Sequence, residues 1–155
     1  MSNALNTASA DTGAADDAPA APFFWTLRVY YEDTDAGGIV FYANYLKFFE
    51  RARTEWLRAQ GISQQRMTEK HHMMFVVKST AVDYHSPAKL DDVLTISVVT
   101  EKLGRASVHF TQQAWRTEGE QRILLASGSI KVGCVDTVGL RPGPIPAEII
   151  DRITV

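Results

Sequence analysis

One change of hydrophobic period, early in the chain, limits the possible folds more than any other feature of this sequence. Apolar residues alternate with polar ones from Phe24 to Tyr31, which is typical of a strand. From about Ala43 to Gln60 the apolar residues recur every three or four positions instead, which predicts an amphipathic helix. The apolar face of this helix comprises Tyr45, Phe48, Phe49, Ala52, Trp56 and Ala59. Gly61 stands where a left-handed residue would end the helix.

The rest of the chain returns to strand patterns. A polar stretch over residues 63–72 has room for another helical turn. Four strand candidates follow with tight connections, and they run over Met73–Asp83, Val93–Glu101, Arg105–Arg116 and Gln121–Val135. Residues 147–153 fit a short final helix. The order of one strand, one long helix and four strands predicts an α+β fold, with the helix packed on an antiparallel sheet.

Length and composition point to one folded domain. The chain has 155 residues, and the first 22 contain eight Ala, three Asp and no Lys or Arg. Such a segment buries too little apolar surface to offset its ordering entropy. We therefore expect a disordered tail over residues 1–22 and a folded domain over residues 23–155. The net charge of −2 gives no electrostatic reason to expect nucleic acid or an anionic membrane surface as a partner.

Several other classes of protein do not fit the sequence. No run of about 18 apolar residues is present, so we expect no membrane span, and the N-terminus lacks the pattern of a secretory signal. The single cysteine, Cys134, excludes an internal disulfide and lies in an apolar run that predicts a buried, inert thiol. We read the adjacent His71 and His72 as loop residues rather than metal ligands, and His85 and His109 as structural or surface residues. A cytoplasmic location is expected.

The segment of residues 30–45 is the most promising place for chemistry. It combines a strand end, an acidic turn with Asp33 and Asp35, the pair Gly37–Gly38, and the start of the long helix. A helix N-terminus presents unpaired N–H groups that can polarise a carbonyl. The glycines permit close approach of a ligand, and a nearby carboxylate can act as a general base or a nucleophile. The same residues also fit a purely structural helix cap with a glycine turn, and both interpretations stay open on physical grounds.

The sequence of residues 28–40, RVYYEDTDAGGIV, resembles the signature of the hotdog-fold acyl-CoA thioesterases of the 4-hydroxybenzoyl-CoA thioesterase type. The continuation over residues 42–46 and 49–55 resembles the YbgC branch, the thioesterases associated with the Tol-Pal system. Further blocks at residues 75–78 and 87–92 fit as well, and the similarity extends from about Trp25 to Val135.

The resemblance implies a curved five-stranded antiparallel sheet wrapped around one long central helix. It further implies a homodimer or homotetramer, in which two subunits extend the sheet and the active sites lie between them. The implied activity is hydrolysis of an acyl-CoA to a free acid and coenzyme A. Coenzyme A is then part of the substrate, and no metal or other cofactor is expected.

Individual roles follow from the same resemblance. Asp35 matches the catalytic carboxylate, Asp33 becomes a turn residue, and the backbone N–H of Tyr42 matches the group that polarises the thioester carbonyl. Arg105 is what remains of a basic run that binds coenzyme A phosphates in the 4-hydroxybenzoyl branch, and it is otherwise a solvated turn residue. The other expected substrate-binding residues are Gly37, Gly38, Ile39, Val40 and Tyr45, of which Tyr45 also fits the core.

Two other functions are compatible with this pattern. The same pocket could belong to a non-catalytic module that binds an acyl thioester or an acyl-carrier protein. A hotdog dehydratase is the third candidate, but that chemistry needs a histidine paired with an acid, and no histidine lies between Asp35 and Tyr42.

Overall fold

The alternating residues that open the domain form one edge of a five-stranded antiparallel sheet. A computed structural model describes residues 21–153, so the expected tail lies outside the described residues except for Ala21 and Pro22. Strand β1 (Phe23–Arg28) pairs with β3, from Phe23 opposite Val98 to Arg28 opposite Val93. The sheet order is β1-β3-β4-β5-β2, with the other strands at Val93–Leu103 (β3), Ser107–Glu118 (β4), Gln121–Asp136 (β5) and Met73–Tyr84 (β2).

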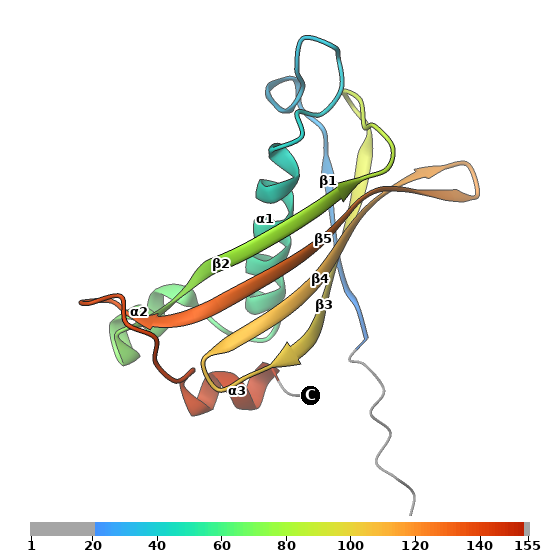
Figure 1. The fold of residues 1–155 in the computed structure, drawn as a ribbon. Helices are drawn as coiled ribbons and strands as arrows, with labels where there is room; N and C mark the ends of the chain where they lie inside the picture. Colours follow the sequence, from blue (N-terminus) through green and yellow to red (C-terminus); the bar gives the residue numbers. More distant parts are fainter. Residues whose placement is uncertain (1–20, 154–155) are drawn as a thin grey trace, which may run out of the picture.

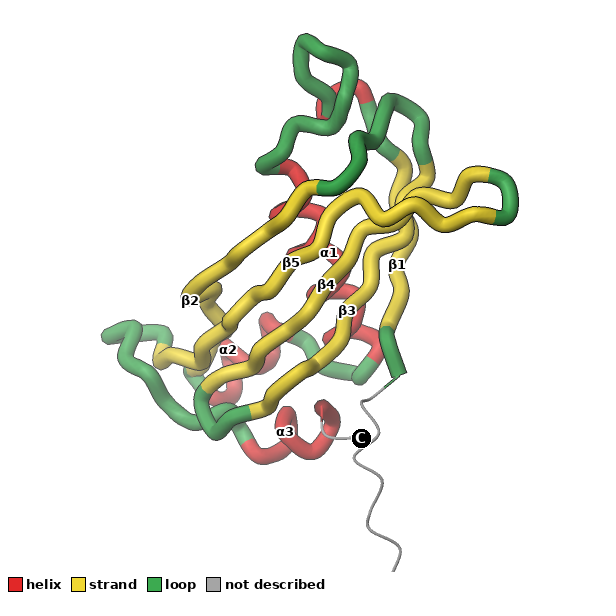
Figure 2. The backbone as a smooth tube through the Cα atoms, turned by 45° about the vertical axis from the view of Figure 1, so that its right-hand side comes forward, coloured by secondary structure: helices red, strands yellow, loops and turns green. Residues whose placement is uncertain are grey.

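Helix α1 (Asn44–Ala59) packs against one face of this sheet, and the strands pass in front of it in Figure 2. Its apolar stripe is fully buried at Phe48, Phe49 and Ala52. Strand β5 approaches the helix so closely at Gly128 that a Cβ there would lie 2.8 Å from the Phe49 ring. A glycine is therefore needed at that point of the strand. The expected α+β arrangement of one long helix on an antiparallel sheet is confirmed (Figure 1).

The helix ends as its sequence predicts. Gly61 has a φ of 76°, in the left-handed region, and its N–H donates to the carbonyl of Arg58. The polar stretch after it forms more structure than the single turn expected there, because Ser63 caps a second helix, α2 (Gln64–His71), by accepting from the N–H of Arg66.

A final helix, α3 (Ala147–Ile153), lies beside α2 at the end of the molecule opposite the start of α1 (Figure 1). Glu148 joins the two short helices by pairing with Lys70 and His71. His71 is thus the last residue of α2 and not the loop residue expected, and its Nε2 lies 2.6 Å from Oε1 of Glu148. Among residues 21–153 no group of three or more His, Cys, Asp or Glu side chains could hold a metal ion.

The structure agrees with the expectation for Cys134 and differs from the expected length of the first strand. Cys134 is buried and burial raises the pKa of its thiol, in agreement with an inert side chain. The strand expected to reach Tyr31 was predicted too long, since β1 ends at Arg28 and the chain turns into a short 3-10 helix over Tyr31–Asp33. No helix within residues 21–153 is long and apolar enough to cross a membrane.

Candidate active site

The loop from β1 to α1 is a compact hairpin held by Asp33. The carboxylate of Asp33 accepts the N–H of Tyr30 at 2.8 Å, which closes the 3-10 turn. Its main-chain carbonyl accepts two further donors, the N–H of Phe41 at 2.9 Å and the side-chain amide of Asn44 at 2.8 Å. Asp33 is therefore the turn residue that the sequence resemblance implied, and its contacts connect the loop to the first turn of α1.

Asp35 forms the tip of this hairpin. Its N–H donates to the carbonyl of Ile39, and its own carbonyl accepts from the N–H of Gly38 at 3.0 Å. Carboxylate oxygen Oδ1 accepts the N–H of Gly37 at 2.8 Å, which forms an Asx turn. Within residues 21–153 the other oxygen, Oδ2, makes no hydrogen bond, and the residue is exposed. One side of the carboxylate is thus oriented and the other is available for chemistry.

Gly37 and Gly38 each meet a different structural requirement of the turn that follows Asp35. Gly38 has a φ of 79°, a conformation that other L-residues rarely adopt. A Cβ on Gly37 would lie 3.2 Å from Oδ1 of Asp35, so a side chain there would press on the carboxylate. The Gly37–Gly38 pair therefore lets the chain turn tightly around Asp35 without displacing it.

The start of α1 has no side-chain cap. The N-cap position is Ala43, eight residues beyond Asp35, and no side chain bonds to the N–H groups of the first turn. The interpretation of Asp33 and Asp35 as caps of the long helix is therefore wrong, although Asp35 does close the glycine turn. In the described part of the chain the N–H groups of Tyr42 and Ala43 have no acceptor. They remain available to a ligand at the positive end of the helix dipole.

An apolar hollow lies beside these N–H groups. It has a volume of about 350 Å³ and is lined from the hairpin and helix start by Ile39, Val40, Tyr42 and Tyr45, and from the end of β2 by Tyr84, His85, Ser86 and Pro87. Tyr45 is only 3% exposed, so it serves both the core and the hollow. Burial raises the pKa of its hydroxyl to about 12, and the side chain is therefore neutral near pH 7.

The far wall of this hollow positions the helix start. The hydroxyl of Tyr84 donates to the carbonyl of Tyr42 at 2.9 Å. The Tyr84 ring also packs edge-on against the rings of Tyr42 and Tyr45, with centroids 6.1 and 5.6 Å apart. Sequence reasoning missed this wall, because residues 85–88 had only the signature of a turn.

Comparison with known proteins places this site in a family. The model of the thioesterase superfamily matches residues 37–123, which include the Gly37–Gly38 pair, the helix start and most of the sheet. The chain belongs to the thioesterase superfamily. The family to which the sequence resemblance pointed is therefore confirmed.

Named relatives of this thioesterase-superfamily chain cover nearly all of its folded part. It is 43% identical to the acyl-CoA thioesterase YbgC of Haemophilus influenzae over 127 residues, which is 82% of this chain and 90% of the relative. A hypothetical protein from Aquifex aeolicus superposes with a TM-score of 0.77 at 28% identity, covering 85% of this chain and 99% of that one.

A further solved structure supports the fold. The 4-hydroxybenzoyl-CoA thioesterase of Pseudomonas sp. strain CBS-3 superposes with a TM-score of 0.78 at 23% identity, covering 84% of this chain and 98% of that protein. The hotdog fold expected from the sequence, with its five-stranded sheet around α1, is confirmed.

Within this thioesterase-superfamily chain, the fold gathers all but one of the expected site residues. Residues 35–45 form the hairpin tip and the helix start, and they line one side of the hollow. Arg105 lies instead in the turn between β3 and β4, where its carbonyl accepts the N–H of Ile145 on the approach to α3. That turn and the β1–α1 loop lie at opposite ends of the sheet (Figure 1). Arg105 therefore does not contribute to the site of its own chain.

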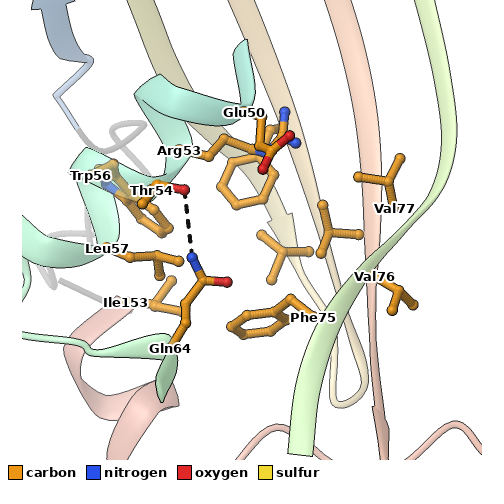
Figure 3. Close-up of a pocket in the computed structure, with 13 residues that line it drawn as sticks. Glu50, Arg53, Thr54, Trp56, Leu57, Gln64, Phe75, Val76, Val77 and Ile153 are labelled. Atoms are coloured by element: carbon orange, nitrogen blue, oxygen red, sulfur yellow. Dashed lines mark hydrogen bonds between the residues drawn. The ribbon is translucent and has the colours of Figure 1, made fainter. Parts of the chain in front are cut away.

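A second cavity lies between α1 and the sheet, away from the expected site. It has a volume of about 130 Å³ and lies between the later turns of α1 and strands β2, β4 and β5 (Figure 3). Arg53 lines it, and the guanidinium donates to Oε1 of the buried Gln112 at 2.8 Å. Burial lowers the pKa of Arg53. None of the expected site residues lines this cavity, so the hairpin hollow remains the candidate active site.

Proposed function

We propose that this protein hydrolyses acyl-CoA thioesters to a free acid and coenzyme A. One observation carries the proposal. The exposed carboxylate of Asp35 and the unpaired N–H of Tyr42 belong to the same hydrogen-bonded connection between β1 and α1, next to an apolar hollow that fits an acyl group. Relatives named as acyl-CoA thioesterases, similar over most of their length, support the same activity.

In the proposed reaction the thioester carbonyl lies at the start of α1. Its oxygen accepts the N–H of Tyr42, which stabilises the negative charge that develops during attack. The helix dipole adds to this stabilisation. The acyl group occupies the hollow between residues 39–45 and the end of β2. Gly37 and Gly38 leave space for the thioester beside Asp35.

Asp35 has two routes to the products. As a general base it takes a proton from water, whose oxygen attacks the acyl carbon, and collapse of the adduct breaks the C–S bond. The departing thiolate then takes the proton from Asp35. As a nucleophile the carboxylate attacks the acyl carbon directly and expels the thiolate, and water hydrolyses the resulting mixed anhydride. Neither route requires a metal or cofactor beyond the coenzyme A of the substrate.

We further propose that the active species contains at least two chains. Asp35 and Tyr42 are both exposed in a single chain, Tyr42 to 63%. Strand β2 lies at an edge of the sheet, so its outer side can pair with β2 of a second copy. The Arg105 of a second copy can lie near a phosphate of the coenzyme A bound to the first chain. Arg105 is too far from the site of its own chain to do this. A tetramer of two such dimers is compatible with this pairing.

The partners and location follow from this activity. An acyl-carrier protein is an alternative donor of the thioester, since it presents the same type of bond. We also propose a cytoplasmic location, the kind of compartment in which the free thiol of Cys134 is stable.

Asp35→Asn tests the proposal. Asparagine keeps the oxygen that accepts the N–H of Gly37 but removes the charge, so the hairpin should stay folded. We expect turnover to fall about 10²-fold or more, measured as release of free thiol from short, long and aromatic acyl-CoA and from acyl-carrier-protein thioesters.

Asp151→Asn, on the exposed surface of α3, is the matched control and should keep full activity. Undiminished turnover in folded Asp35→Asn would remove Asp35 from the mechanism. A wild-type protein that binds an acyl-carrier protein and hydrolyses no thioester would instead identify a binding module.

A further inference from the structure

The face of the sheet that turns away from α1 carries a row of basic side chains. The register places Lys131 of β5 opposite His109 of β4, and His109 opposite Lys102 of β3. We call Lys102, His109 and Lys131 the basic row. The chain neighbours Phe110 and Val132 are buried in the core, so the row faces the opposite side of the sheet. The ammonium groups of Lys102 and Lys131 therefore lie on the same face of the sheet, one on each side of His109.

The two lysines of the basic row have no carboxylate partner in the described part of the chain. Glu101, the bulged residue beside Lys102, forms no ion pair within residues 21–153 either. Lys78 adds a further basic residue, because its stem lies across Gly133, two residues beyond Lys131 on β5. The positive charges therefore gather on one face and lack a partner there.

Hydroxyl groups complete a hollow around the basic row. The hollow has a volume of about 330 Å³, and Ser79, Ser107 and Ser129 line it together with the three basic residues. Nε2 of His109 lies 2.6 Å from the hydroxyl of Ser129. The lining thus combines hydroxyls, ammonium groups and an imidazole, all of which can donate hydrogen bonds, with no carboxylate among them.

We propose that this hollow binds a phosphate group as its dianion. A phosphate has three or four acceptor oxygens and a charge of about −2 near neutral pH, which matches convergent donors around two lysines. The row lies on strands β3, β4 and β5 and includes none of residues 35–45, so this hollow shares no residue with the candidate active site of the same chain. The phosphate can come from inorganic phosphate or from a nucleotide, which share this chemistry.

Binding of inorganic phosphate to the full chain tests this proposal. The ring signals of His109 would be followed by NMR while phosphate replaces chloride at constant ionic strength. We expect a saturable shift of these signals. Lys131→Gln removes one of the two ammonium groups of the basic row and should weaken binding about 10-fold or more. Lys47→Gln, an exposed lysine on α1, is the matched control and should bind as the wild type does.

Two results would overturn the site. His109 signals that move no more with phosphate than with chloride would do so, as would unchanged affinity in Lys131→Gln. A second titration with adenosine 3′,5′-bisphosphate separates the sources of the phosphate. Tighter binding than inorganic phosphate assigns the site to a nucleotide, and equal binding assigns it to the free ion. These measurements involve no turnover, so they stand or fall separately from the role of Asp35.

Discussion

At the scale of single residues, the start of α1 depends on a tyrosine from the edge strand β2. The hydroxyl of Tyr84 holds the carbonyl of Tyr42, which belongs to the same residue as the N–H proposed to polarise the thioester. Burial and the neighbouring Tyr42 raise the pKa of Tyr84, so it remains a hydrogen-bond donor near pH 7. Tyr84 does not need to touch the reacting atoms, and we regard it as a positioning residue.

Tyr84→Phe should therefore slow the reaction without weakening substrate binding. The ring keeps its packing, but the Tyr42 peptide loses its anchor. We expect kcat for acyl-CoA hydrolysis to fall about 3- to 10-fold, with KM changed less than about 2-fold. Tyr31→Phe is the matched control, because Tyr31 is 83% exposed and its hydroxyl makes no hydrogen bond in the described part of the chain. A raised KM with normal kcat would show that Tyr84 only lines the hollow.

At the scale of elements, a buried polar network joins α1 to the sheet. Gln112 of β4 is fully buried, and its amide nitrogen donates to the carbonyls of Phe49 at 3.0 Å and Ser97 at 3.4 Å. Its oxygen accepts from Arg53 on α1. Buried polar groups are stabilising only when each has a partner, so loss of one member leaves the others unsatisfied.

Gln112→Leu should lower the free energy of unfolding by about 2 kcal/mol, because the half-buried guanidinium of Arg53 then lacks its hydrogen-bond acceptor. The double variant Gln112→Leu/Arg53→Met should recover part of this loss. Urea unfolding of the full chain measures both changes. Gln113→Leu serves as the control on the same strand, since its side chain makes no hydrogen bond within residues 21–153. Equal effects of Gln112→Leu and Gln113→Leu would exclude a special role for the network.

At the scale of the whole molecule, the sheet order leaves β1 and β2 as edges. Strand β2 has 12 residues, and no described strand pairs with its outer side. Val77, near its middle, is 50% exposed, which fits a strand edge that a second copy would cover. In such an assembly the second copy would lie beside the exposed Asp35. Its Arg105 could then reach the coenzyme A bound to the first chain.

We therefore expect the wild-type protein to sediment with at least about twice the chain mass of 17.2 kDa. Val77→Asp places a charge on the proposed interface and should shift the mass toward one chain and reduce turnover together. Val138→Asp, at a residue that is 94% exposed in the loop after β5, should change neither. A fully active wild-type monomer would contradict the proposed assembly.

The sequence predicted local structure best where the pattern was long and periodic. The long helix was expected over residues 43–60 and forms over Asn44–Ala59, and the last helix lies where it was expected. Errors occurred where a single local side-chain hydrogen bond, which interrupts or replaces the periodic pattern, decides the outcome. Strand β1 ends three residues early because Asp33 closes a turn there, and α2 forms because Ser63 caps a stretch with little apolar periodicity.

By itself the sequence determined the order of elements, the buried face of α1 and the family motif around Asp35, because periodicity and motif spacing are properties of neighbouring residues. Only the tertiary structure decided which distant residues meet. It placed Tyr84 against Tyr42, aligned Lys102 with His109 and Lys131, and separated Arg105 from Asp35. The physical reason is that strand order and register arise from packing across the whole sheet, and no local pattern encodes them.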